Sequence, residues 1–119
     1  MRGRVTPSRR RKNRRTPEHH RVYVVRLEHP KAKGRTCYYV GMTGLPVEQR
    51  FVHHKRGYKS ARVVQLYGVE LAREWFEEIP AMSYEEAALA EPTLADDLRD
   101  LGYLVFGPTN RKPNRQPRR

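Results

Sequence analysis

Cysteine is nearly absent from the chain, whose 119 residues include only Cys37. A single thiol cannot form an internal disulfide, and it excludes a zinc site built from several cysteines. Long apolar runs are also missing: no segment approaches the roughly 18 uninterrupted apolar residues of a membrane-spanning helix, and residues 1–20 lack the apolar stretch of a secretory signal. We therefore expect a cytoplasmic protein with no membrane partner, associated with the nucleoid if its source is bacterial.

Acidic residues are scarce at both ends of the chain. The formal net charge is +12, from 25 Lys and Arg against 13 Asp and Glu. Residues 1–20 hold eight basic residues and one acid, residues 107–119 hold five and none, and residues 21–106 hold twelve of each. The ends are also poor in apolar residues, so they cannot bury enough surface to offset the entropy of ordering. We expect a basic flexible arm over 1–20, one folded domain over 21–107 and a basic tail over 108–119.

Nucleic acid is the partner that this charge distribution favours, because basic segments release counterions from a phosphate backbone. The folded part is itself polarised, with a net charge of +8 over 21–62 and of −8 over 63–106. An alternative is that the basic ends only aid solubility or bind ribosomal RNA without specificity. The residues that we expect to contact nucleic acid are Arg9, Arg10, Arg11, Lys12, Arg14, Arg15, Lys55, Arg56, Lys59, Arg111 and Lys112.

Four segments are rich enough in β-branched and aromatic residues to predict strands. Residues 21–28 and 37–42 predict a hairpin with a polar loop over 29–36 between its strands. A third strand is expected within 68–79, where the alternation is less regular, and a last one over 103–106. The sheet should therefore have three to four strands and be mostly antiparallel.

Helix signals lie between these strands. A proline opens a helix over 46–56, which Gly57 ends, and a short helical turn is expected over 60–67. A capping box, Ser83-Tyr-Glu-Glu86, starts a longer helix that ends at Gly102. The order of elements predicts a small α+β domain with a central sheet flanked by helices.

One residue of the long expected helix conflicts with its apolar stripe. Ala87, Leu94, Leu98 and Leu101 recur at spacings of seven, four and three, and Glu91 falls among them. An ionised carboxylate on the core side of a helix is unfavourable unless it is paired or binds a metal. Lys and Arg are absent from 84–98, so its own helix offers no partner. The alternative is that Glu91 lies at the edge of the stripe and reaches solvent.

Four more polar side chains complete a candidate constellation. Tyr23 and Tyr39 lie on the two hairpin strands, and Arg50 and His54 are four residues apart on the first helix. A tyrosine or histidine can accept a proton from water, and an arginine can hold a phosphate through two bonds. A lone carboxylate such as Glu91 can hold Mg²⁺. These are the groups needed to hydrolyse a phosphodiester, although strand tyrosines commonly only pack and an Arg-x-x-x-His pair is commonly a solvated face.

Short motifs containing these residues follow one another in a fixed order along the chain. They are Arg21-Val-Tyr23, Tyr39-Val-Gly41, Arg50 with His54 four residues later, Ala87-Ala-Leu-Ala-Glu91, and Asn110 after the last expected strand. This ordered set resembles the GIY-YIG nuclease family over roughly residues 21–110.

The resemblance implies a metal-dependent endonuclease that hydrolyses phosphodiester bonds in DNA. Glu91 would hold one divalent ion, Mg²⁺ or Mn²⁺. Tyr39 or Tyr23, with help from His54, would orient or deprotonate the attacking water. Arg50 would stabilise the charge that develops on the phosphate.

The chain also departs from the family pattern. Arg21 stands where the first signature has glycine, and Met42 stands where some members have lysine. Pro92 follows the expected metal ligand inside a helix, where proline costs about 3 kcal/mol unless a kink is accommodated. Asn110 would be structural or would contact the nucleic-acid backbone. Two alternatives stay open: a non-catalytic nucleic-acid-binding protein on the same fold, and a ribosome-associated basic protein.

Overall fold

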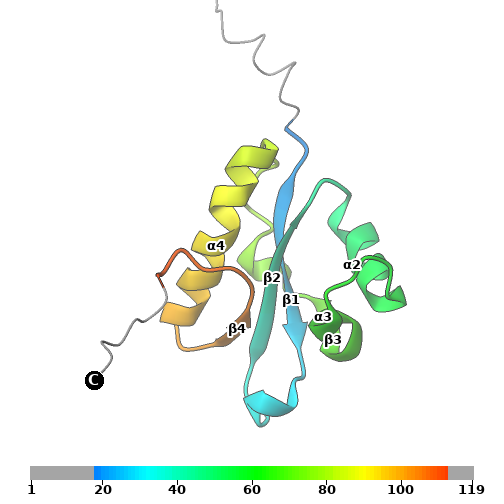
Figure 1. The fold of residues 1–119 in the computed structure, drawn as a ribbon, viewed down its shortest axis with the longest axis vertical. Coiled ribbons are helices and arrows are strands. Elements are labelled where there is room, and N and C mark those ends of the chain that lie inside the picture. Colours follow the sequence, from blue (N-terminus) through cyan, green and yellow to red (C-terminus); the bar gives the residue numbers. More distant parts are fainter. Residues whose placement is uncertain (1–17, 113–119) are drawn as a thin grey trace, which may run out of the picture.

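β1 (Arg21–Leu27) and β2 (Cys37–Thr43) form the centre of a four-stranded sheet in this computed structural model, which describes residues 18–112 (Figure 1). β3 (Gly68–Leu71) pairs antiparallel with β1, and β4 (Leu104–Phe106) pairs parallel with β2, in the order β3-β1-β2-β4. The sheet is therefore mixed, with two antiparallel pairings and one parallel pairing. The predicted α+β class is confirmed.

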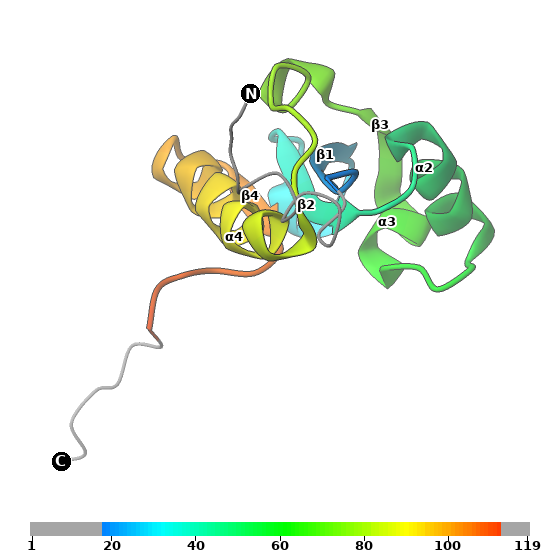
Figure 2. The ribbon, with the colours of Figure 1, turned by 90° about the horizontal axis from the view of Figure 1, so that it is seen from above.

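The helices lie on both sides of the central β1–β2 pair. α2 (Val47–Arg56) and α3 (Arg62–Tyr67) lie on one side, and α4 (Tyr84–Asp100) lies on the other (Figure 2). Two short 3₁₀ helices, η2 (Pro30–Ala32) and η3 (Arg73–Trp75), form parts of the connections. None of the helices in the described part of the chain is long and apolar enough to cross a membrane.

Local sequence signals set most element boundaries. In the predicted capping box, the Ser83 hydroxyl accepts from the Glu86 amide at 3.1 Å, and the Glu86 carboxylate accepts from the Ser83 amide at 3.0 Å. Gly57 follows α2 with φ +83° and Gly102 follows α4 with φ +100°, conformations that glycine adopts without strain. The apolar residues of β1 are buried because this central strand is covered on both faces.

The third strand lies within the expected segment 68–79 and ends at Leu71, because the amides of Trp75 and Phe76 turn back to the carbonyls of Ala72 and Arg73. One expectation about packing is wrong. Leu101 is 62% exposed and is not part of the apolar stripe. It follows the last turn of α4.

The buried face of α4 includes two residues that were not predicted. Ala95 and Pro92 are buried together with Ala87 and Leu98. Pro92, Ala95 and Leu98 follow one another at steps of three, which keeps them on one face of a helix with 3.6 residues per turn. Pro92 lies inside an uninterrupted helical segment, and its missing amide leaves the Ala88 carbonyl without its usual helical donor.

Candidate active site

Tyr23 and His54 form a buried hydrogen-bonded pair between β1 and α2. The Tyr23 hydroxyl lies 2.7 Å from His54 Nε2, and both side chains are almost fully inaccessible to solvent. The amide of Ala61 donates to His54 Nδ1 at 3.0 Å. Because an amide nitrogen can only donate, Nδ1 carries a lone pair and no hydrogen.

The direction of the Tyr23–His54 bond follows from this contact. Burial, and then the charges of Arg50 and His53, lower the pKa of His54 to about 4, so the ring is neutral at pH 7. Its single hydrogen is on Nε2 and is donated to the Tyr23 oxygen. The alternative that Arg50 and His54 form a solvated face does not hold for His54, which is buried against β1.

Tyr39 lies beside this pair, and Gly41 makes the arrangement possible. The Tyr39 ring lies 6.2 Å from the Tyr23 ring and 5.6 Å from the His54 ring, measured between ring centres. Gly41 pairs with Tyr23 across the two strands. A Cβ at position 41 would lie 2.7 Å from the Tyr23 hydroxyl oxygen and 2.9 Å from the Tyr39 ring. Only glycine therefore lets the two rings pack over this point of β2.

Arg50 reaches the same cluster from α2. Its guanidinium donates to the carbonyls of Lys59, at 2.7 Å, and Tyr58, at 3.4 Å, which fixes its position. Burial raises the pKa of Tyr23, and the phenol of Tyr39 adds to this effect, whereas the charge and hydrogen bonding of Arg50 oppose it. The charge of Arg50 therefore favours negative charge on the phenol oxygens of Tyr23 and Tyr39.

Glu91 approaches the cluster from α4, on the other side of the central strands. Its side chain is half-buried, and burial raises the pKa of its carboxyl group. Burial also raises the pKa of Tyr39, and the negative charge of Glu91 raises it further. Within residues 18–112, no Lys or Arg forms an ion pair with Glu91. Glu91 thus adjoins Tyr39, and Tyr39 in turn lies beside Tyr23 and His54.

A hard divalent cation fits the Glu91 carboxylate. Mg²⁺ commonly takes one or two protein carboxylates and completes its coordination with water and phosphate oxygens. A half-buried carboxylate with no cationic partner among the described residues meets that requirement. Clusters of three or more His, Cys, Asp or Glu side chains placed to hold a metal do not occur between residues 18 and 112.

Lys55 is placed differently from the other cations predicted to contact nucleic acid. Its ammonium group donates to the carbonyls of Gly68, Gln65 and Val64, at 2.9, 3.0 and 3.4 Å. Its three donors are thus occupied at the C-terminal end of α3, and Lys55 stabilises that helix end. Arg56 and Lys59 are exposed.

The segment after β4 is held against α4 by Asp96. This carboxylate accepts from the Thr109 hydroxyl at 2.7 Å, from the Arg99 guanidinium at 2.8 Å and from the Asn110 amide at 2.9 Å. These contacts lower the pKa of Asp96 to about 2, and the hydrogen bond from Thr109 contributes most. Sequence reasoning missed Asp96, although an aspartate three residues before an arginine was the available signal.

Asn110 and Arg111 are exposed, and both bond to other residues of the protein. The Asn110 side chain donates to the Thr93 hydroxyl at 3.0 Å. Arg111 pairs with Asp100. Lys112 is exposed. The predicted arm residues at positions 9–15 lie outside the described part of the chain.

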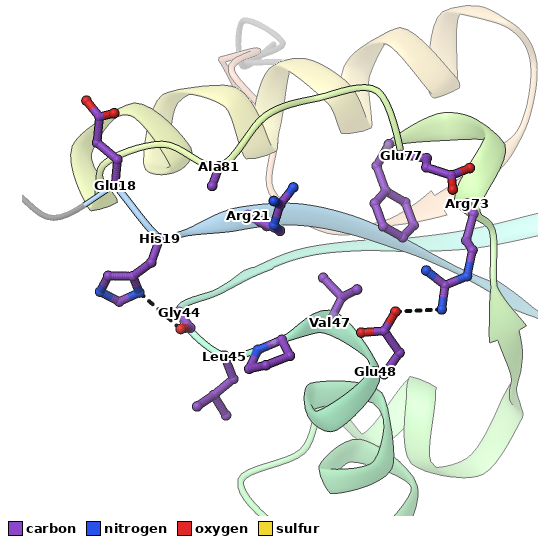
Figure 3. Close-up of a pocket in the computed structure, with 12 residues that line it drawn as sticks. Glu18, His19, Arg21, Gly44, Leu45, Val47, Glu48, Arg73, Glu77 and Ala81 are labelled. Atoms are coloured by element: carbon purple, nitrogen blue, oxygen red, sulfur yellow. Dashed lines mark hydrogen bonds and ion pairs between the residues drawn. The ribbon is translucent and has the colours of Figure 1, made fainter.

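A separate cavity of about 480 Å³ lies at the N-terminal end of α2 (Figure 3). Arg21 lines it and donates to the carbonyl of Ile79 at 3.3 Å. An ion pair between Arg73 and Glu48, with 2.8 Å between the atoms, borders the same cavity. Arg21 thus faces this cavity, and the tyrosine cluster does not line it.

Comparisons of the chain with known protein families, with curated proteins and with solved structures find no match.

Proposed function

We propose that the protein is a divalent-metal-dependent endonuclease that hydrolyses phosphodiester bonds in DNA. The observation that carries the proposal is a half-buried carboxylate beside the phenol of Tyr39, which itself adjoins a second phenol and a guanidinium. Glu91 comes from α4, Arg50 from α2, and the tyrosines from the strands between them. Phosphodiester hydrolysis needs groups of these types within reach of one phosphate.

Each residue has a chemical task in this proposal. Arg50 binds the non-bridging phosphate oxygens and stabilises the charge that grows on them. Glu91 holds Mg²⁺ or Mn²⁺, which when bound supplies positive charge that favours deprotonation of water.

Tyr39 is the better of the two phenols for accepting the proton from water, which it does as a phenolate after its own proton has passed to solvent. The Tyr23 oxygen already accepts the Nε2 hydrogen of His54, and His54 has no free lone pair that could take the Tyr23 proton. Tyr23 is therefore held as a neutral phenol that positions Tyr39.

A non-catalytic nucleic-acid-binding protein is the second candidate. Burial raises the pKa of both Tyr23 and Tyr39, which opposes formation of a phenolate at neutral pH. The basic residues of the chain would serve either function equally well.

Nicking of supercoiled plasmid DNA tests the proposal. We expect the wild-type protein to nick the plasmid with Mg²⁺ or Mn²⁺ and to stop when EDTA is added. Glu91→Gln keeps the shape of the side chain and removes its charge, so it should lower the rate by at least about a hundredfold. Asp97→Asn, an exposed acid on the same helix, is the matched control and should keep the wild-type rate.

Two outcomes would contradict the nuclease. One is the absence of nicking by the wild-type protein with either metal, and the other is equal nicking by wild type and Glu91→Gln. Binding of the same plasmid without nicking would favour the second candidate.

A further inference from the structure

The loop between α2 and α3, residues 57–60, presents an aromatic ring to solvent. Tyr58 is 56% exposed. Its ring meets the ring of His53 edge-on, with 5.2 Å between ring centres and 80° between planes. The ammonium group of Lys59 lies 5.6 Å from the centre of the Tyr58 ring.

The backbone of this loop is fixed to the candidate active site. The Tyr58 amide donates to the His53 carbonyl at 2.9 Å, and Arg50 donates to the carbonyls of both Tyr58 and Lys59. Lys59 has φ +46°, a left-handed conformation that a residue with a side chain adopts only when its surroundings impose it. The exposed ring is therefore held at a defined place next to the arginine expected to bind the phosphate.

The surroundings of the ring carry unneutralised positive charge. Arg56, Lys59 and Arg62 are exposed, and none forms an ion pair with an acidic side chain of the described chain. The nearest acid along 47–62 is Glu48, which is bonded to Arg73. Basic side chains around an exposed aromatic ring are the combination that binds single-stranded nucleic acid.

We propose that the 57–60 loop binds DNA at an unpaired nucleotide, whose base stacks on Tyr58 while Arg56 and Lys59 contact the flanking phosphates. The inference rests on the proposed function for the role of Arg50, which would then hold a phosphate adjoining the unpaired nucleotide. In a fully paired duplex both faces of each base are already stacked, so a side-chain ring has no base face to meet unless the base leaves the stack. The preferred substrate class is therefore DNA with an unpaired or unstacked base.

Tyr84 provides a matched control within the same chain. It is 57% exposed, and its ring meets the ring of His20 edge-on at 5.4 Å and 80°. It begins α4, however, where Glu85 and Glu86 follow it. The two tyrosines thus have nearly the same exposure and the same ring geometry but opposite surrounding charge.

The experiment uses two DNA hairpins that differ at one position. The fluorescent base 2-aminopurine is unpaired and bulged in the first hairpin and paired with thymine in the second. We expect the wild-type protein to quench the bulged base and to bind that hairpin more tightly. Tyr58→Ala should weaken binding of the bulged hairpin by roughly 5- to 150-fold, the range typical of one base–aromatic stack.

The other variants test whether the aromatic ring and its position cause the effect. Tyr58→Phe keeps the ring and should keep both the quenching and the affinity, and Tyr84→Ala should change neither. Equal loss of affinity for both hairpins in Tyr58→Ala, or quenching that persists in that variant, would overturn the inference. Quenching lost only in Tyr58→Ala, with no nicking of plasmid, would refute the nuclease and support binding at the loop.

Discussion

The two sides of the sheet use their arginines differently. On the α2–α3 side, Arg56 and Arg62 are exposed and make no ion pair with any acid of residues 18–112. On the α4 side, Arg99 pairs with Asp96, and Arg111 pairs with Asp100. Counting charges along a chain therefore does not tell how much of the charge is available to a partner. The α2–α3 side keeps its charge available, whereas the arginines of the α4 side hold the protein together.

The candidate active site lies where these two sides meet. Its cationic group, Arg50, belongs to the α2–α3 side, which we call the basic side. Its carboxylate, Glu91, belongs to the α4 side, which we call the acidic side. The tyrosines of β1 and β2 lie between them. A phosphate and a metal ion carry opposite charges, so a site at this boundary can attract both.

The largest effect is expected where the two sides are joined, at Gly41. In Gly41→Ala the new methyl group would lie within 3 Å of both tyrosine side chains, which must then move apart. We expect the free energy of unfolding to fall by about 1–3 kcal/mol, the usual range for overpacking a core. Urea unfolding measures the loss, and the near-ultraviolet circular dichroism of the tyrosines should change with it. An unfolding free energy equal to that of wild type would mean that the rings separate freely and that Gly41 is not required.

A smaller effect is expected from the exposed arginines of the basic side. Each phosphate contact contributes about 0.9 to the slope of log affinity against log salt, so Arg56→Ala combined with Arg62→Ala should lower that slope by about 1.8. Arg111→Ala should leave it unchanged, because Arg111 is paired with Asp100. Fluorescence anisotropy with a labelled DNA duplex at several salt concentrations measures the slope. Equal salt slopes for the double variant and wild type would show that Arg56 and Arg62 make no phosphate contacts, and that the two sides do not differ in this respect.

Lys55 lies on the basic side too, but its ammonium group is occupied by carbonyl groups, so it serves as a control for the salt slope. Lys55→Ala should leave the salt slope at its wild-type value. It should instead lower the free energy of unfolding by about 1 kcal/mol, since the carbonyls at the end of α3 lose a charged donor. A lower slope with unchanged stability would show that Lys55 contacts DNA after all.

We expect His54, a neutral residue buried on the basic side, to influence the pH dependence of stability. Its pKa is lowered from 6.5 to about 4, with burial as the main cause. Between these pH values the unfolded chain binds a proton that the folded protein does not, so stability is complete above pH 6.5 and falls toward pH 4. One such group adds a slope of at most about 1.4 kcal/mol per pH unit.

Comparison of variants isolates the contribution of His54. The His54→Gln protein should be less stable overall but should show a shallower dependence of unfolding free energy on pH between 6.5 and 4. Urea unfolding at a series of pH values measures this. If the unfolding free energy of His54→Gln depends on pH as steeply as that of wild type, groups other than His54 cause the dependence.

Local patterns predicted the elements, but long-range contacts determine the roles of individual side chains. The hairpin strands, the capping box at Ser83 and the glycine after α2 follow from signals within a few residues. Glu91 was recognisable because a carboxylate conflicts with an apolar helix face. The burial of His54 and the capping by Lys55 depend on Ala61 and α3 packing against α2, which no spacing within α2 reveals. Leu101 was mispredicted because the stripe was extended beyond the end of the helix.

The parallel pairing of β2 with β4 has a consequence for synthesis of the protein. β4 follows α4 near the end of the described chain, so one edge of β2 stays open while nearly every other element is already made. Pairings that close so long a loop form slowly, and an open strand edge can recruit other chains in the meantime. Glu91 is carried by the helix that precedes β4, so during synthesis this carboxylate is made after the tyrosines and the arginine of the candidate site.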